Sequence, residues 1–158
     1  MRDLNETLNK LIKFANENEN IRGLILQGSF VNENAPIDIF SDLDPLFYVT
    51  SLDQFIHDNT WKNYFGEVMI EWGDSWDIKE GEKGYTRLTI YKDGFKLDFG
   101  FQHISLAKYA NDMPLYKVYV DKDNLIPSPE VADESKFFVQ KPTNQDYQVI
   151  LLDFYFDT

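Results

Sequence analysis

A pair of β-rich runs within Tyr85–Gln102, divided by Asp93-Gly94, constrains the fold of this chain more than any other feature. Asp-Gly between two alternating runs is typical of a two-residue hairpin with a type I′ turn. This register predicts the cross-strand pairs Lys92–Phe95, Ile90–Leu97 and Leu88–Phe99. The apolar pairs then form one core face, and Asp98 points away from that core because successive side chains alternate between the two faces.

The rest of the pattern predicts helices as well as further strands. Residues 3–17 carry one apolar stripe at helical spacing, and Asp3 followed by Glu6 resembles a capping box at the start of that helix. Other signals predict helices over 51–57 and 144–156, strands over 21–27, 42–50, 67–72 and 116–120, and a charged loop over 73–84. The chain is therefore expected to be an α/β (α+β) protein.

Composition excludes several classes of function. The 158 residues include no cysteine and only two histidines, which excludes thiol catalysis, Cys-based zinc sites and His-rich metal sites. A formal charge of −12 argues against nucleic acid as a partner and favours a cationic small molecule, or an anionic one carried by metal ions. The sequence shows no apolar run of about 20 residues and no signal peptide, so we expect a cytoplasmic protein without a membrane partner.

The stretch that points to chemistry begins at the end of the predicted strand 21–27. Gly28-Ser29 follows this strand, where a small residue lets the backbone approach a ligand and the serine offers a hydroxyl and an N–H to a phosphate oxygen. Twelve residues separate this pair from Asp42-Leu43-Asp44. On a strand, the two carboxylates of this motif project from one face, while Leu43 points into the core.

Two neighbouring carboxylates repel each other, and a divalent cation can neutralise them. Oxygen ligands of this kind suit Mg²⁺, and Asp98 is a third ligand if its strand lies beside that of Asp42 and Asp44. Three carboxylates can hold two Mg²⁺ ions for in-line phosphoryl or nucleotidyl transfer. The spacing also fits a solvated turn, because Asp-x-Asp arises by chance in acidic chains.

The residues Ile21–Thr50, which contain Gly28-Ser29 and Asp42-Leu43-Asp44, resemble the aminoglycoside 6-adenylyltransferases, also called streptomycin adenylyltransferases. The match covers about residues 20–157 and continues, in order, through Phe55-Ile56, Trp61, Tyr64-Phe65-Gly66-Glu67, Asp93-Gly94, Leu97-Asp98 and Lys141-Pro142-Thr143. The resemblance implies a nucleotidyltransferase fold of the DNA polymerase β type, a mixed sheet flanked by helices. It also implies transfer of AMP from Mg·ATP to a hydroxyl group of a streptomycin-like aminoglycoside.

The same resemblance implies roles for individual residues. Gly28 and Ser29 would bind the triphosphate of ATP, the nucleotide substrate. Asp42, Asp44 and Asp98 would be the catalytic residues that hold the Mg²⁺ ions. The acceptor would be a cationic small molecule, an aminoglycoside, which suits the acidic composition.

Two departures from the family pattern matter. Phe30 stands where the family usually has an arginine after Gly-Ser, so a cation near the triphosphate is missing. The family continues into a C-terminal helical domain that helps to build the acceptor site, whereas this sequence stops at Thr158. We therefore expect a nucleotidyltransferase domain over 1–140 and the start of a helical region over 141–158. The apolar residues 149–156 are expected to meet a second copy of the chain or a helical partner.

Two other functions fit the same residues. One is a minimal nucleotidyltransferase that modifies a protein partner, and the other is a non-catalytic nucleotide-binding module that lacks its helical domain. Arg87, diagonal to Asp98 in the predicted register, is expected to form either a cross-strand ion pair or a triphosphate contact. Lys96 is either a solvated strand lysine or a phosphate ligand. The tryptophans within 71–77 either anchor a surface loop or stack a base and bind a cationic sugar.

Overall fold

The computed structural model describes residues 3–32, 41–58, 60–79, 81–113 and 115–128, together with 141, 143, 144 and 147. The strands are β1 (Ile21–Gln27), β2 (Asp44–Val49), β3 (Val68–Asp77), β4 (Lys83–Tyr91), β5 (Lys96–His103) and β6 (Tyr116–Asp121). The α-helices are α1 (Leu4–Glu17) and α2 (Asp53–His57), and the 3₁₀ helices are η1 (Ser29–Val31), η2 (Trp61–Tyr64) and η3 (Ile104–Asp112).

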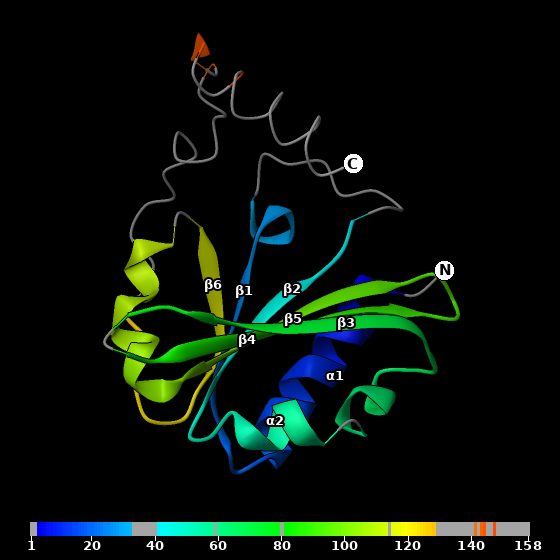
Figure 1. Ribbon diagram of the computed structural model, residues 1–158. Coiled ribbons are helices and arrows are strands. Elements are labelled where there is room, and N and C mark those ends of the chain that lie inside the picture. Colours follow the sequence, from blue (N-terminus) through cyan, green and yellow to red (C-terminus); the bar gives the residue numbers. More distant parts are fainter. Residues whose placement is uncertain are drawn as a thin grey trace.

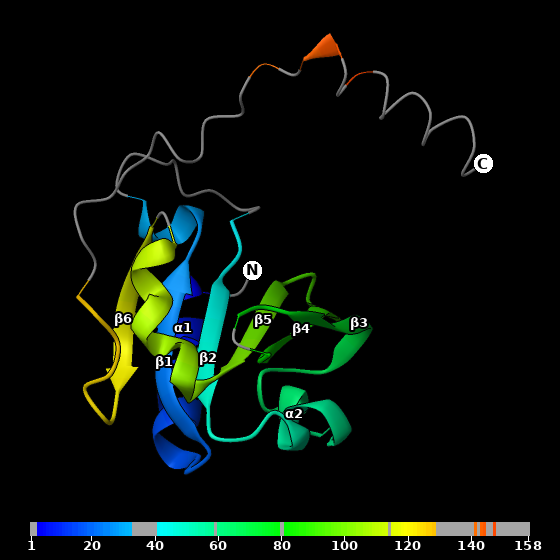
Figure 2. The ribbon, with the colours of Figure 1, turned by 60° about the vertical axis from the view of Figure 1, so that its left-hand side comes forward.

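The six strands form one mixed sheet with helices on both faces (Figures 1 and 2). Their order across the sheet is β3-β4-β5-β2-β1-β6. β2 and β5 run parallel, and the other neighbouring pairs run antiparallel. The parallel pair lies at the centre of the sheet, so the start of β2 lies beside the start of β5 although a long stretch of chain separates the two strands. The predicted mixed sheet flanked by helices is confirmed.

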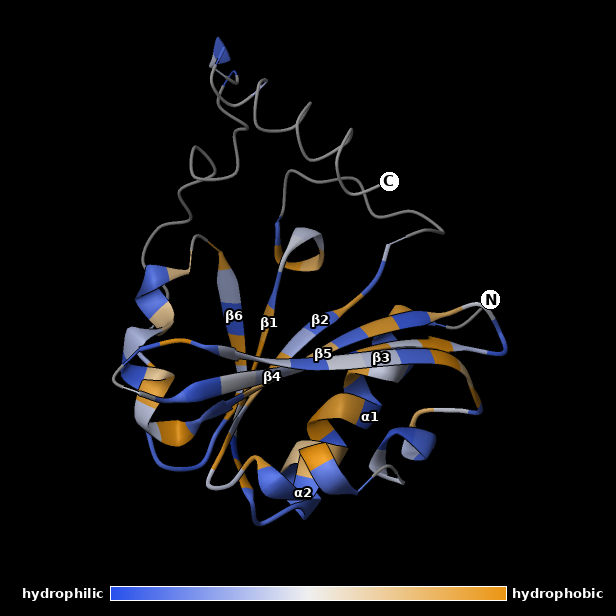
Figure 3. Ribbon diagram, viewed as in Figure 1, coloured by the Kyte–Doolittle hydropathy of each residue, from blue (hydrophilic) through white to orange (hydrophobic). Residues whose placement is uncertain are grey.

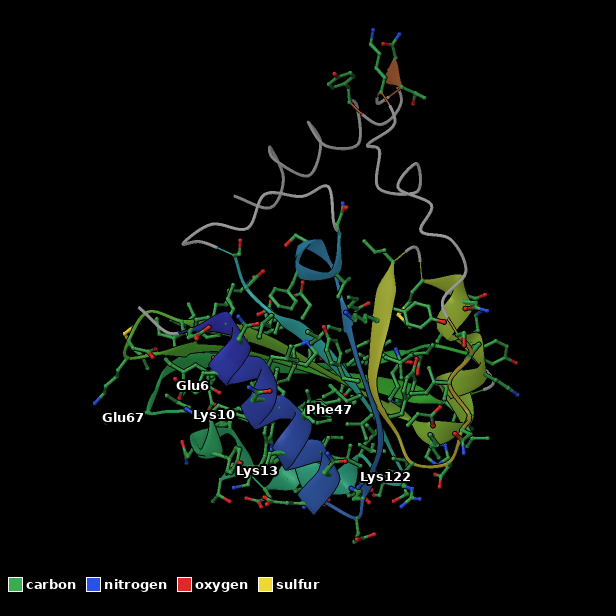
Figure 4. The ribbon with its side chains drawn as sticks, turned by 180° about the vertical axis from the view of Figure 1, so that it is seen from behind. Glu6, Lys10, Lys13, Phe47, Glu67 and Lys122 are labelled. Carbon is green, nitrogen blue, oxygen red and sulfur yellow. The ribbon has the colours of Figure 1, made fainter. Side chains whose placement is uncertain are left out.

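The first helix, α1, lies along one face of the sheet. Its residues Leu11 and Ala15 are fully buried against the sheet, because the apolar residues of α1 recur on one side of the helix. Asp3 caps the helix as predicted, since its Oδ1 accepts a hydrogen bond from the backbone N of Asn5 at 2.8 Å. Glu6 forms an ion pair with Lys10 at 2.9 Å, and the side chains of this pair lie along α1 in Figure 4.

Two apolar layers hold the sheet between its helices. The main layer lies under α1, α2 and η2 and contains the stacked rings of Phe47 and Phe101, whose centroids are 5.3 Å apart. The second layer lies under η3 and buries Ile25, Leu46 and Tyr48. The helices α1 and α2 carry both hydrophobic and hydrophilic residues in Figure 3, as expected when one side of a helix is packed and the other faces water.

The hairpin between β4 and β5 exists, but its predicted register is wrong by one residue. Tyr91 N donates to Phe95 O at 2.9 Å, and Gly94 N donates to Tyr91 O at 2.9 Å, so the loop has three residues rather than two. Gly94 has a φ of +82°, which suits the last position of such a loop.

The one-residue shift changes which side chains of β4 share a face with those of β5. Leu88 pairs with Asp98, not with Phe99. The side chains of β4 that reach the main core are therefore Tyr85, Thr89 and Tyr91, and all of them are buried. The core face predicted for β5 is correct, since Leu97 and Phe99 are fully buried.

The charged loop predicted over 73–84 is also wrong. β3 continues to Asp77, and β4 already begins at Lys83. The two strands pair from Val68–Tyr91 to Asp77–Lys83, and β3 forms one edge of the sheet. The strand predicted over 67–72 is confirmed as the first part of β3. The continuation to Asp77 is exposed, and it carries no alternation of apolar and polar residues that could have predicted it.

Several predictions concern the C-terminal part of the chain. The domain boundary after residue 140, the helix over 144–156 and the association through 149–156 fall largely outside the described residues, and they stay predictions. Among the helices that the structure describes, none combines the length and apolar character that crossing a membrane requires.

Candidate metal and nucleotide site

The structure brings the three predicted carboxylates together. Asp42 lies just before β2, Asp44 is the first residue of β2, and Asp98 is the third residue of the parallel neighbour β5. One carboxylate oxygen from each lies within 4.8 Å of the other two. Leu43 is fully buried and forms an isolated β-bridge with Leu97, so its neighbours Asp42 and Asp44 face the opposite side. Strand alternation therefore builds this cluster, as the Asp-x-Asp spacing predicts.

Gly28 places the backbone directly beside this cluster. Its φ is +79°, a conformation that residues with a side chain rarely adopt. A Cβ added at Gly28 would collide with Oδ2 of Asp44, so glycine is required here for space as well as for conformation. Ser29 follows at the start of η1 and is exposed, which leaves it accessible to a ligand. Phe30, by contrast, packs against the main core.

Lys96 brings a positive charge to the cluster. Its Nζ lies 2.6 Å from Oδ2 of Asp98 and 3.2 Å from Oδ2 of Asp42. The hydrogen bond to Asp98, with that to Asp42 and the charges of both carboxylates, raises the pKa of Lys96 above its usual value. Lys96 therefore neutralises part of the negative charge while no metal is bound.

Asp44 remains poorly neutralised. Burial, followed by the charges of Asp42 and Asp98, raises the pKa of Asp44 to about 6, although Lys96 acts in the opposite direction. In addition, Oδ1 of Asp98 is buried and has no hydrogen-bond partner among the described residues. A buried oxygen without a partner is costly, and so is a carboxylate that carries excess negative charge.

These features fit a divalent cation. The donor atoms are carboxylate oxygens, which are the ligands that Mg²⁺ prefers. A cation bound among them would give the buried Oδ1 of Asp98 a partner and would lower the pKa of Asp44. The three carboxylates are therefore candidate metal ligands. Gly28 leaves room beside them for a ligand from outside the protein, such as a phosphate oxygen.

The cluster lies in a cavity of about 410 Å³ that continues across the sheet. Asp44, Asp98 and Gly28 line one part of it, and Thr86, Leu88 and Trp76 line the part over β4 and β3. The sequence offers Trp76 as one alternative for stacking a ligand, but it places neither Thr86 nor Leu88 at the site. Leu88 was placed on the core face by the wrong hairpin register, and Trp76 was placed in a loop.

Other residues that the sequence singles out lie outside the cluster. Arg87 pairs with Phe99 on the opposite face and forms an ion pair with Glu71 at 3.6 Å, so the predicted position diagonal to Asp98 is wrong. His103 has a structural role at the start of η3, where its Nδ1 lies 2.8 Å from Oγ of Ser105.

The whole chain, residues 1–158, matches the family model described as streptomycin adenylyltransferase. The chain is 34% identical over 152 residues to the aminoglycoside 6-adenylyltransferase of Staphylococcus aureus, a match that covers 93% of this chain and 54% of the relative. It is 32% identical over 148 residues to the enzyme of the same name from Campylobacter jejuni, covering 92% of this chain and 51% of the relative. The chain thus spans about half the length of these curated relatives.

A solved structure has the same fold. The crystal structure of an aminoglycoside 6-adenyltransferase from Bacillus subtilis superposes with a TM-score of 0.64 and 22% sequence identity. The superposition covers 98% of this chain and 54% of the solved one. The similarity therefore extends over the six-stranded sheet and its helices, and it concerns one part of a longer molecule.

Proposed function

Because the chain belongs to the streptomycin adenylyltransferase family, we propose that it transfers AMP from ATP to a hydroxyl group of an aminoglycoside, with Mg²⁺ as the metal. The resemblance of Ile21–Thr50 to that family is confirmed by the family match. The observation that carries the proposal is the convergence of Asp42, Asp44 and Asp98 beside the backbone of Gly28. Such clusters position metal ions for in-line nucleotidyl transfer.

In this proposal Asp42, Asp44 and Asp98 hold the metal. When bound, Mg²⁺ supplies positive charge to the phosphates of ATP and to the group that is transferred. The acceptor hydroxyl oxygen forms a bond to the α-phosphorus, the bond from that phosphorus to pyrophosphate breaks, and the hydroxyl gives up its proton. The contribution of the chain is to position both reactants and to concentrate carboxylates where the metal is needed.

Gly28 and Ser29 would bind the phosphates. The left-handed conformation of Gly28 and the lack of a side chain let a phosphate oxygen approach the backbone next to Asp44. The exposed Ser29 adds a hydroxyl and an N–H group. These groups favour the β- and γ-phosphates over a neutral ligand because they are hydrogen-bond donors.

Lys96 would supply a cation that the family pattern places elsewhere. Phe30 packs against the core and cannot contact a phosphate through a positive charge. Lys96 already lies at the carboxylates, and its side chain is 44% exposed, so it is free to turn toward a phosphate once a metal neutralises Asp42 and Asp98. The Lys96 ammonium then contacts the nucleotide rather than the carboxylates.

The proposal is tested by pyrophosphate release from ATP in the presence of Mg²⁺ and streptomycin. Release is expected from the wild type and is expected to fall at least about 100-fold in Asp44→Asn, because a metal ligand is lost. Asp53→Asn is the matched control, since Asp53 is an exposed aspartate at the start of α2. Binding of Mg·ATP without pyrophosphate release on any acceptor would instead favour a nucleotide-binding module.

A further inference from the structure

Trp76 has a position that the proposed roles do not explain. It lies on the edge strand β3 and lines the same cavity as Asp44 and Asp98. Its side chain is 41% exposed, which is unusual for so large an apolar group. The indole covers the backbone of β4, since a Cβ added at Gly84 would lie 2.6 Å from two of its ring atoms. An aromatic ring is thus held in place against a strand, with its remaining surface open.

The cavity extends across the sheet from the end of β1 to β3. Gly28 follows β1, Asp44 begins β2, and Asp98 lies on β5. Leu88 comes next on β4, and Trp76 lies on β3 at the far edge of the cavity, further along that strand and opposite Gly84. A ligand that starts at the phosphate-binding end beside β1 therefore passes the carboxylates before it reaches the tryptophan.

In-line transfer excludes pyrophosphate from the Trp76 end and brings the attacking oxygen from that side. The attacking oxygen and the leaving oxygen stand on opposite sides of the phosphorus. If pyrophosphate leaves on the side of Gly28 and Ser29, and the phosphorus lies among Asp42, Asp44 and Asp98, the attack comes from the side of β4 and β3. The group that reaches toward Trp76 is then the acceptor, not the pyrophosphate.

We infer that Trp76 forms the acceptor subsite and stacks on a sugar ring of a cationic aminoglycoside, an inference that rests on the proposed function. Leu88 lines the same cavity and adds apolar surface to it. Aromatic side chains bind the apolar faces of sugar rings, and they attract neighbouring cationic groups.

The charge around this end of the cavity suits such a ligand. Asp74 lies on the same face of β3 as Trp76, because it pairs with Thr86, which lines the cavity. Asp98 provides negative charge at the other end, and the chain as a whole has a formal charge of −12. A polycationic acceptor is therefore attracted to a surface that would repel a second anionic ligand.

The test is the dissociation constant of streptomycin for the full chain, measured by titration calorimetry without nucleotide. Trp76→Ala is expected to weaken streptomycin binding about 10-fold, and Trp76→Phe, which keeps an aromatic face, about threefold or less. Tyr64→Ala is the control, because Tyr64 is an aromatic residue of similar exposure that lies in η2 and does not line the cavity. Circular dichroism checks that each variant is folded.

The affinity for Mg·ATP, measured on the same variants, separates the two possible occupants. Unchanged Mg·ATP affinity in Trp76→Ala supports an acceptor subsite. The inference is overturned if Trp76→Ala binds streptomycin like the wild type, if it loses affinity only for Mg·ATP, or if the wild type binds no streptomycin. Trp76-dependent streptomycin binding without any pyrophosphate release would refute the proposed reaction alone. Release with an unchanged streptomycin affinity in Trp76→Ala would refute the subsite alone.

Discussion

Lys96 and Asp98 lie on the same face of β5, with Nζ of Lys96 2.6 Å from Oδ2 of Asp98. The same ammonium is 3.2 Å from Oδ2 of Asp42, so one lysine joins the carboxylates of two parallel strands. An ammonium in this position competes with a metal ion for the same oxygens. Under the proposed function, the metal affinity of these carboxylates is therefore expected to depend on how easily Lys96 moves away.

Lys96→Met is expected to raise the affinity for a metal ion in the absence of nucleotide by about 10-fold, because a competing cation is removed. The measurement is Mn²⁺ binding followed by electron paramagnetic resonance. Lys92→Met is the control, since Lys92 pairs with the exposed Glu67 outside the site. An unchanged or lower Mn²⁺ affinity in Lys96→Met would show that the lysine does not compete with the metal.

Asp44 gives the metal-free protein a characteristic dependence of stability on pH. The folded state raises the pKa of Asp44 from its ordinary value of 3.8 to about 6, so the folded state holds this proton more tightly than the unfolded state does. The free energy of unfolding is therefore expected to fall as the pH rises from about 4 to about 6.

Asp44→Asn is expected to remove this dependence. At pH 7.5 in EDTA the variant is expected to melt about 2–4 °C higher than the wild type. The reason is that the neutral amide avoids the cost of burying an ionised carboxylate, which is about 1 kcal/mol after allowance for solvent screening. Near pH 4 the two proteins are expected to melt at similar temperatures. Thermal unfolding in buffers from pH 4 to pH 8 measures the difference, and a variant that melts lower than the wild type at pH 7.5 would contradict the prediction.

Gly28→Ala is expected to weaken Mn²⁺ binding at least about 10-fold, because the new Cβ displaces the carboxylate of Asp44. Gly94→Ala is the matched control. Gly94 has a similar φ of +82° but open space around it, so alanine there should cost only about 1 kcal/mol of conformational strain and leave Mn²⁺ affinity unchanged. Equal Mn²⁺ affinities in the two variants would show that space beside Asp44 is unimportant.

Glu71 stabilises two cations on the core side of β3. Its Oε2 lies 2.5 Å from Nζ of Lys62, whose side chain is only 6% exposed, and 3.6 Å from Nη1 of Arg87. Glu71→Gln is expected to lower the free energy of unfolding by about 2 kcal/mol, because a buried ammonium loses its counter-charge. Urea denaturation measures this change. The exposed Glu67→Gln should change it by less than about 0.5 kcal/mol, and equal effects would contradict the prediction.

The parts of the fold that sequence reasoning found are those in which local pattern and burial agree. The strand Ile21–Gln27 has the predicted bounds because its apolar run is buried in the middle of the sheet. The convergence of Asp42, Asp44 and Asp98 was also predictable, since Leu43 must be buried and strand alternation then turns both neighbours the other way.

The parts that it missed depend on contacts between strands. Asp93-Gly94 suits both a two-residue loop and a three-residue loop, and the choice between them is made where Tyr85, Thr89 and Tyr91 pack into the core. Once that register is shifted, Leu88 joins the site face. Trp76 could not be placed in the cavity because β3 is an exposed edge strand, whose position follows only from its pairing with β4.

The parallel pairing of β2 with β5 decides when, during synthesis and folding, Asp98 can join Asp42 and Asp44. The chain runs through α2, η2, β3 and β4 between β2 and β5. Contacts so distant in sequence form slowly during folding. Asp42 and Asp44 therefore leave the ribosome well before Asp98 can join them, and a nascent or cleaved chain that ends before β5 has an incomplete set of ligands. If the three carboxylates bind a metal as proposed, high-affinity binding requires β2 and β5 to be paired.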